Sequence, residues 1–157
     1  MFTYLGCPVA TDDHYEIIEN MCFYFKDDFG VHDFASAQTA CESKFPYGSG
    51  QLFEPKSLSH LQQVRETIQR RGMNCFYLGI DDSANEENYV YTSDNSHLVS
   101  TIDSTIVVTN GCGPQKECDH LYTCNGITDI YTIWSDYPFV DLVCVNIRIP
   151  EGMLFIC

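Results

Sequence analysis

The 157-residue sequence predicts a single α+β domain. Two stretches in its first half carry apolar residues at helical spacing, and short apolar runs typical of strands follow them. Between those strands lies a long loop, residues 94–126, which has little periodicity and contains three cysteines. Two early helices followed by strands around a long loop are typical of an α+β domain.

The first helix is expected within residues 34–50. Four apolar residues there have the spacing i, i+3, i+7 and i+11, which places them on one helical face: Phe34, Ala37, Cys41 and Phe45. The last residue, Cys157, follows the apolar run Met153–Ile156, so a Cys41–Cys157 bridge would join the first helix to a terminal strand. Such a bridge closes most of the chain into one loop and contributes roughly 4–5 kcal/mol in the chain-entropy model.

The second helix is expected after Ser57 or Ser59, since either residue can cap it. An apolar stripe and a following glycine support this helix: Leu58, Leu61, Val64, Ile68 and Gly72. Three arginines lie towards its end, Arg65, Arg70 and Arg71, and we interpret them as favourable partners of the helix dipole.

The remaining elements are expected to be strands. Cys22–Phe25 is an aromatic run suited to a strand, and a Cys7–Cys22 bridge would staple an N-terminal hairpin over residues 7–22. Other strands are predicted at residues 75–80 and 89–91 and, after the long loop, at 129–134, 139–149 and 153–157. Within the long loop only residues 105–108 have strand character. A loop of this length in a compact domain is usually functional.

Nine cysteines indicate an extracellular protein stabilised by disulfides, because cytosolic proteins rarely contain so many. Residues 1–6 lack a signal-peptide pattern, so we interpret the chain as a mature secreted form. No apolar run is long enough to span a bilayer. Since nine is odd, we expect one thiol to be free or bonded to another chain, which provides a route to a homo-oligomer.

Charge and motifs argue against several classes of function. A net charge of −14 with eight basic residues argues against nucleic acid and anionic membranes as partners. The five histidines form no His-x-x-x-His pattern, and the sequence has no Gly-x-Ser-x-Gly, Walker or dinucleotide-binding motif. We therefore expect no enzymatic activity.

Several motifs together resemble the C-type lectin-like domain. Phe34-x-x-Ala37-x-x-x-Cys41 resembles its first helix, and Leu52–Ser57 resembles the connection to its second helix in invertebrate members. Further matches are Tyr77–Ile80 with the family's WIGL strand, Tyr89–Asp94 with FVWSDG, Phe155–Cys157 with the terminal FIC, and Cys7 and Cys22 with the added pair of the long form. The resemblance implies two helices, two small antiparallel sheets and a long disulfide-pinned loop.

The resemblance also shows what this chain lacks. Members that bind sugars hold a calcium ion with oxygen ligands from a Glu-Pro-Asn or Gln-Pro-Asp loop and from the Asn-Asp of a WND strand. Neither tripeptide occurs in residues 94–144. The best match to WNDxxC is Phe139–Cys144, which has Val140 in place of the asparagine and keeps Asp141 as a candidate ligand; Trp134–Asp136 also lacks the asparagine. We therefore predict that the sugar-coordinating calcium site is lost.

An auxiliary calcium site is the alternative. Asp82 and Glu86 occupy places where family members have two calcium ligands, and Glu117 or Asp119 of the long loop would complete the set. The contrasting interpretation is that Asp82 and Glu86 are solvated turn residues. We expect no cofactor, with calcium as the alternative.

The family pattern suggests further disulfides. Cys144 is expected to pair with Cys124, or otherwise with Cys118. A Cys112–Cys118 bridge would then leave Cys75 unpaired, either as a buried thiol or bonded to another chain.

We predict a secreted, non-enzymatic recognition module that binds an extracellular protein or glycan ligand through the long loop, without the usual calcium–sugar contact. One alternative is a calcium-dependent lectin with a rearranged site built from Asp82, Glu86 and loop carboxylates. A second alternative is an acidic structural protein of an extracellular matrix, joined through the odd cysteine.

Overall fold

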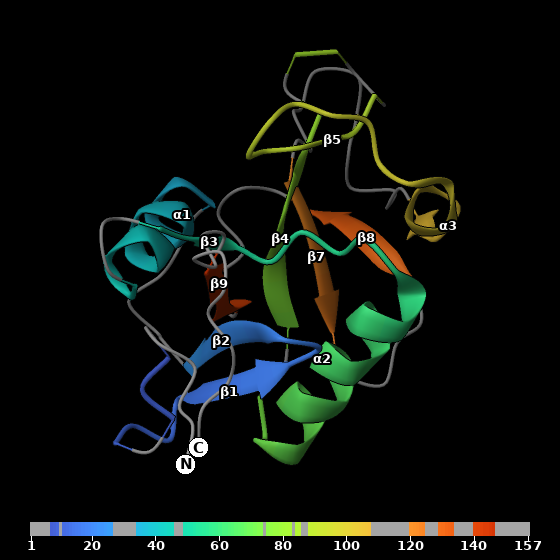
Figure 1. The fold of residues 1–157 in the computed structure, drawn as a ribbon. Coiled ribbons are helices and arrows are strands. Elements are labelled where there is room, and N and C mark those ends of the chain that lie inside the picture. The colour runs from blue at the N-terminus through green and yellow to red at the C-terminus, as the bar shows by residue number, and fades with distance from the viewer. Residues whose placement is uncertain are drawn as a thin grey trace.

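The computed structural model describes residues 7–9, 11–26, 34–45, 49–73, 75–82, 84–85, 88–107, 120–124, 129–133 and 140–146 (Figure 1). The elements follow in the order β1 (Tyr15–Ile18), β2 (Met21–Lys26), α1 (Phe34–Ser43), β3 (Gly50–Leu52), α2 (Leu58–Arg70), β4 (Cys75–Asp81), β5 (Val90–Tyr91), α3 (Ser100–Asp103), β6 (Ile106–Val107), β7 (His120–Cys124), β8 (Ile130–Ile133) and β9 (Val140–Asn146).

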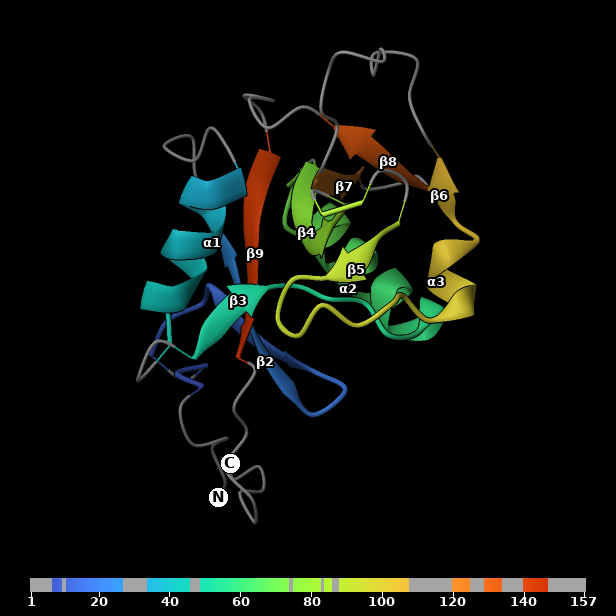
Figure 2. The same ribbon diagram turned by 90° about the horizontal axis from the view of Figure 1, so that it is seen from above.

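Strand β9 joins the two halves of the sheet. The strands follow the order β1-β2-β9-β4-β7-β8-β6, with β3 also paired to β9 and β5 to β4. β9 runs antiparallel to β2 and β3 but parallel to β4. Figures 1 and 2 show α1 and α2 on opposite sides of the arrangement, with β9 and β4 between them. Helices outside a mainly antiparallel sheet confirm the predicted α+β class.

The N-terminal hairpin is closed by a two-residue turn. Ile18 pairs with Met21, and between them Glu19 and Asn20 have φ angles of 48° and 66°. Two successive positive φ values define the type I′ turn that suits the twist of a two-stranded hairpin. Asparagine adopts this conformation readily, whereas glutamate rarely does. A disulfide joins Cys22 of β2 to Cys7, as the sequence predicts.

Helix α1 buries the face that its spacing predicts. Phe34, Ala37, Cys41 and Phe45 are all buried. Strand β3 passes so close that a Cβ atom on Gly50 would lie 1.9 Å from the carbonyl oxygen of Cys41, which explains the glycine there. Cys41 is disulfide-bonded. Its predicted partner, Cys157, lies outside the described residues, so the Cys41–Cys157 bridge stays a prediction.

Helix α2 begins at the predicted cap, since the backbone N–H of His60 donates to Ser57 Oγ over 3.1 Å. Gly72, with φ of 72°, follows the helix. Leu61, Val64 and Ile68 are fully buried, but the prediction that Leu58 belongs to this stripe is wrong, because Leu58 is 45% exposed in the first turn. The buried face instead includes His60.

The interpretation of Arg65 as a partner of the helix dipole is also wrong. Arg65 is 5% exposed, and its Nε and Nη2 atoms donate to Thr123 Oγ1 over 2.9 and 2.6 Å. Nη2 also donates to the backbone oxygen of Asp129 over 3.2 Å. Burial lowers the pKa of the guanidinium, and the charge of Asp129 opposes that shift. Arg65 therefore ties α2 to β7 and to the residue before β8.

Part of the predicted long loop is regular structure. Residues 100–103 form α3, and residues 120–124 form β7, which pairs with β4 and β8 in the middle of the sheet. The alternation in β7 spans only five residues, with Leu121 and Thr123 fully buried. So short a strand has no strong local signal, because its stability comes from pairing with distant strands.

The structure corrects the predicted pairing of two cysteines. Cys75 is not unpaired: it is bonded to Cys124, with a Cα–Cα distance of 4.0 Å. The expected Cys124–Cys144 bridge is therefore wrong. The physical reason is the register of β4 and β7, which places Cys75 directly opposite Cys124. Cys112 and Cys118 lie outside the described residues, and Cys144 is described only as part of the backbone of β9.

The core contains many aromatic rings. The largest fully buried side chains include Phe23, Phe25, Phe53, Phe76, Tyr77 and Tyr91. Their rings make edge contacts, such as that between Phe23 and Phe53 at 5.3 Å between centroids. None of the helices in the described residues has the length and apolar character that crossing a bilayer requires.

Candidate functional site

The start of the long loop is fixed by a buried carboxylate. Glu54, whose side chain is 3% exposed, accepts hydrogen bonds from the backbone N–H and the hydroxyl of Ser93 at 2.9 and 2.8 Å. Lys56 Nζ lies 3.7 Å from the same carboxylate. Burial raises the pKa of Glu54, and the hydrogen bonds from Ser93 partly offset that shift. Glu54 therefore holds the turn that follows β5 against the connection between β3 and α2.

Gly79 allows this approach. A Cβ atom at this position of β4 would lie 2.9 Å from Glu54 Cγ and 3.0 Å from the carbonyl oxygen of Leu52. The backbone of Gly79 also donates to Phe53 and accepts from Thr92, at 2.8 and 2.9 Å. The glycine that the sequence motif predicts is thus required by packing.

Tyr91 and Asp94 fix the next residues of the segment. The Tyr91 hydroxyl donates to the carbonyl oxygen of Pro55 over 2.6 Å, and Lys56 Nζ lies 3.3 Å from the centroid of the Tyr91 ring. Burial raises the pKa of Tyr91. Asp94 accepts from the hydroxyl and backbone N–H of Ser96 at 2.6 and 2.9 Å, and these hydrogen bonds lower the pKa of Asp94.

The end of the segment is fixed by covalent and polar contacts. Cys124 is bonded to Cys75 of β4, and the neighbouring Thr123 accepts from Arg65 of α2. Both ends of residues 94–126 are therefore fixed to the rest of the domain, the first at the turn that contains Ser93 and the second at strand β7. We name these two places the entry anchor, centred on Glu54, and the exit anchor, centred on Cys124.

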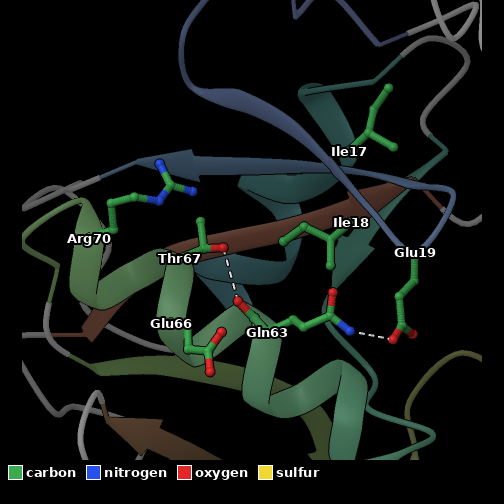
Figure 3. A pocket seen from close by; sticks show the side chains of 7 residues that line it. All are labelled: Ile17, Ile18, Glu19, Gln63, Glu66, Thr67 and Arg70. Atoms are coloured by element: carbon green, nitrogen blue, oxygen red, sulfur yellow. Dashed lines mark hydrogen bonds between the residues drawn. The ribbon is translucent and has the colours of Figure 1, made fainter.

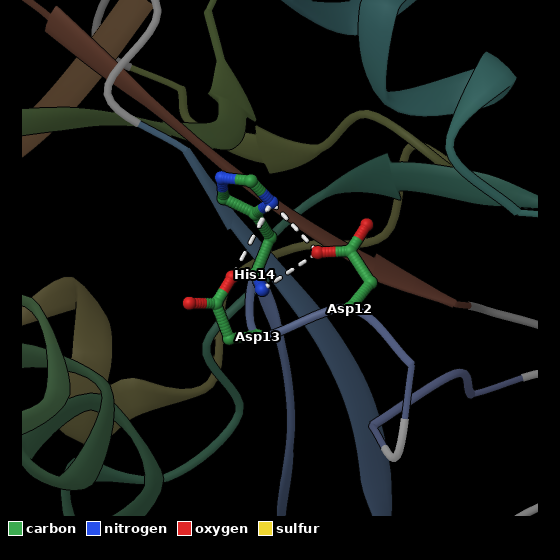
Figure 4. Close-up of side chains that lie close together, drawn as sticks. All are labelled: Asp12, Asp13 and His14. Atoms are coloured by element: carbon green, nitrogen blue, oxygen red, sulfur yellow. Dashed lines mark hydrogen bonds and ion pairs between the residues drawn. The ribbon is translucent and has the colours of Figure 1, made fainter.

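Among the described residues, one group of side chains has the composition of a metal site. Asp12, Asp13 and His14 lie before β1, with their ligand atoms within 4.8 Å of one another (Figure 4). Asp12 Oδ1 already accepts from the backbone N–H of His14 at 2.9 Å and contacts His14 Nδ1 at 2.7 Å. The backbone hydrogen bond is the largest cause of the lowered pKa of Asp12. Asp12 thus caps the turn before β1, and the side chain of Asp13 is fully exposed. We therefore interpret the group as a turn cap and not as a metal site.

A groove lies between the β1–β2 turn and α2 (Figure 3). Its volume is about 400 Å³, and it is lined by Ile17, Ile18 and Glu19 from the hairpin side and by Gln63, Glu66, Thr67 and Arg70 from α2. Sequence reasoning did not find this groove, because its two walls come from distant parts of the chain.

Several solved structures match this arrangement over most of the chain. The mouse scavenger receptor C-type lectin carbohydrate-recognition domain matches with a TM-score of 0.63 and 20% identity, covering 89% of this chain and 97% of its own. Human lithostathine matches with a TM-score of 0.65 and 15% identity, covering 90% and 91%. The C-type lectin CEL-I of Cucumaria echinata matches with a TM-score of 0.62 and 15% identity, covering 85% and 95%. The chain adopts the C-type lectin-like fold. No family model and no curated protein sequence matches it.

The predicted calcium ligands of this C-type lectin-like domain are only partly within the described residues. Asp82 directly follows β4 and is 2% exposed, so it is not the solvated turn residue of the contrasting interpretation. Glu86, Glu117 and Asp119 lie outside the described residues. The auxiliary calcium site therefore stays a prediction.

Asp141 lies far from Asp82 in the C-type lectin-like domain. It belongs to β9, where its backbone is the partner of Phe76 near the start of β4. Asp82 follows six residues later along β4, which corresponds to roughly 20 Å at the rise of an extended strand. The structure thus does not bring these two predicted ligands together.

Proposed function

We propose that this C-type lectin-like domain is a secreted, non-enzymatic recognition module. It binds an extracellular protein or other ligand through residues 94–126, without the usual calcium–sugar contact. The observation that carries this proposal is the anchoring of the segment at both ends. Binding residues are often presented by loops that a rigid scaffold positions, and the entry and exit anchors provide such a scaffold.

The contacts of the two anchors support a structural role for their polar groups. The Glu54 carboxylate is already satisfied by Ser93 and Lys56, and the Arg65 guanidinium by Thr123 and a backbone oxygen. These buried charged groups therefore stabilise the two anchors, and we assign the ligand contacts to the residues between the anchors. The absence of Glu-Pro-Asn and Gln-Pro-Asp from the sequence supports recognition without the calcium–sugar contact.

Replacement of the segment tests the proposal. In the variant, a Gly-Ser linker of equal length without cysteines replaces residues 108–119, while Cys75 and Cys124 remain. Both proteins are tested against arrays of glycans and extracellular proteins, in millimolar calcium and in chelator. We expect the natural chain to bind a ligand equally in both solutions and the linker variant to lose binding.

The exposed groove residue Glu66 provides a matched control, since Glu66→Ala changes a surface charge outside residues 94–126. This variant is expected to keep binding. Circular dichroism must show that the linker variant is still folded. Undiminished binding by a folded linker variant would refute binding through residues 108–119, the part of the segment that the linker replaces.

A calcium-dependent lectin is the second candidate function. The burial of Asp82 favours it, because a carboxylate at the end of a central strand is suitably placed to ligate a cation. Under this candidate, calcium raises the melting temperature of the domain, and Asp82→Asn abolishes the rise. Asp103→Asn, at an exposed position, is the control. Under the first proposal, neither the natural chain nor either variant responds to calcium.

A further inference from the structure

The disulfides Cys7–Cys22 and Cys75–Cys124 differ in their exposure to solvent. Cys7 and Cys22 are 3% and 0% exposed, so their bridge lies inside the core. Cys75 and Cys124 are both partly exposed. Because a thiolate opens a disulfide by direct attack on one of its sulfur atoms, access to the bridge controls the rate of reduction. Of these two bridges, Cys75–Cys124 is therefore the one that a reductant reaches more easily.

The position of Cys75–Cys124 in the sheet explains its exposure. Cys75 is the first residue of β4, and Cys124 is the last residue of β7, the antiparallel strand beside it (Figure 1). The bridge thus joins two strand ends, and the fully buried Thr123 and Phe76 form the next pair inward. Opening the bridge therefore breaks no backbone pairing within the ladder.

Noncovalent contacts keep β7 in place after the bridge opens. β7 pairs with β4 on one side and with β8 on the other, and its Leu121 and Thr123 are fully buried. Arg65 of α2 donates to Thr123, next to the bridge. Cys41 is also disulfide-bonded and fully buried. We therefore expect the domain to stay folded when Cys75–Cys124 is reduced, with an exit anchor that has lost its covalent part.

We propose that the Cys75–Cys124 bridge is a redox-sensitive switch, which fixes the end of residues 94–126 when oxidised and loosens it when reduced. In the reduced domain, strand β7 opens more often because its end is no longer bonded to β4. A loosened segment must be ordered again when it binds, and this cost lowers affinity. The effect on affinity rests on the proposed function, whereas the loosening of β7 does not.

The reductant of this switch is a dithiol. One thiolate of the dithiol attacks a sulfur of the bridge and forms a mixed disulfide, while the other cysteine leaves as a thiolate and takes up a proton. The second thiol of the reductant then displaces the mixed disulfide. Two electrons pass to the bridge, so the protein gains two thiols and the dithiol becomes a disulfide.

Stepwise reduction of the natural chain with dithiothreitol tests the switch without any ligand. New thiols are alkylated in short pulses and located by mass spectrometry, and circular dichroism follows the fold. Cys75 and Cys124 are expected to be labelled before Cys7 and Cys22, while the circular dichroism stays unchanged. Labelling of Cys7 and Cys22 first or at the same time would overturn the switch, and so would labelling that appears only as the fold is lost.

Amide hydrogen exchange measures the loosening of the partly reduced chain. Residues 120–124 of β7 are expected to lose protection by up to about 10³-fold, the factor that corresponds to the loop entropy of this bridge. Strand β2, which the buried Cys7–Cys22 bridge still holds, is expected to lose less protection. Equal protection of β7 before and after labelling of Cys75 and Cys124 would contradict the proposal.

The same glycan and protein arrays test the effect on binding. The natural chain is expected to give weaker signals after Cys75 and Cys124 have been reduced and alkylated, and unchanged signals would refute this effect. Cys75→Ser/Cys124→Ser should match the reduced chain and not respond to dithiothreitol, whereas the control Cys7→Ser/Cys22→Ser should still respond. Binding that persists in the linker variant would refute the proposed function alone, because the order of reduction and the exchange of β7 are measured without a ligand.

Discussion

Removal of the Cys75–Cys124 bridge, which forms the exit anchor, is expected to destabilise the domain strongly. The bridge spans a sequence separation of 49 residues, whereas Cys7–Cys22 spans 15. The chain-entropy relation gives about 4 kcal/mol for the longer loop and about 3 kcal/mol for the shorter one. We expect the double variant Cys75→Ser/Cys124→Ser to lose about 4 kcal/mol of unfolding free energy, and Cys7→Ser/Cys22→Ser to lose about 3 kcal/mol.

Equilibrium unfolding in guanidinium chloride, without reductant, measures both losses. Each double variant avoids a lone thiol that would exchange with other bridges. Equal stability of the natural chain and the Cys75→Ser/Cys124→Ser variant would refute this reasoning, and so would a non-reducing peptide map that joins Cys124 to Cys144. The same map assigns the partner of Cys41: Cys157 is our prediction, and Cys144 is the alternative because α1 packs against β9.

Three further substitutions test contacts that stabilise the domain. Arg65→Met is expected to lower the free energy of unfolding by about 2–4 kcal/mol, because the buried hydroxyl of Thr123 loses its charged donor; chemical denaturation measures this. Burial raises the pKa of Glu54, so the protonated side chain stabilises the fold at a pH below its ordinary pKa of 4.5, and this stabilisation is lost as the pH rises through the pKa of the folded protein. Glu54→Gln should therefore show a smaller fall in melting temperature than the natural chain over that pH range. Gly50→Ala forces a methyl group onto the backbone of Cys41 and is expected to cost about 1–3 kcal/mol, measured by thermal unfolding.

Local periodicity was sufficient to predict the two longer helices, α1 and α2, but not the short α3. The spacing of Phe34, Ala37 and Cys41 follows the helical repeat, and the structure buries that face. Ser57 and Gly72 likewise mark the two ends of α2, because a cap and a positive-φ glycine act within a few residues of the backbone they serve.

Pairing between strands that are distant in the sequence could not be predicted from local periodicity. Strand β7 is stabilised by β4 and β8, and five residues with two buried positions do not identify it alone. The error in assigning Cys75 has the same origin, since the register that opposes it to Cys124 exists only after β4 and β7 have paired. Family resemblance also misdirected the assignment, because it connected Cys124 with Cys144.

The burial of polar residues was also not predicted from the sequence. His60 and Arg65 interrupt the apolar stripe of α2, so a count of apolar residues treats both as surface positions. Their burial depends on partners elsewhere in the chain: Glu19 in the hairpin turn for His60, and Thr123 in β7 for Arg65. The candidate site has the same character, since its two anchors combine residues far apart in sequence.

The central place of β9 has a consequence for biosynthesis. Its residues, 140–146, pair with β2, β3 and β4, all of which are translated earlier. Until the ribosome has delivered β9, those three strands have open edges that can associate with other chains. Assembly of the sheet therefore waits for a late segment, and a ribosome that stalls before residue 140 would release an aggregation-prone product that needs chaperone protection.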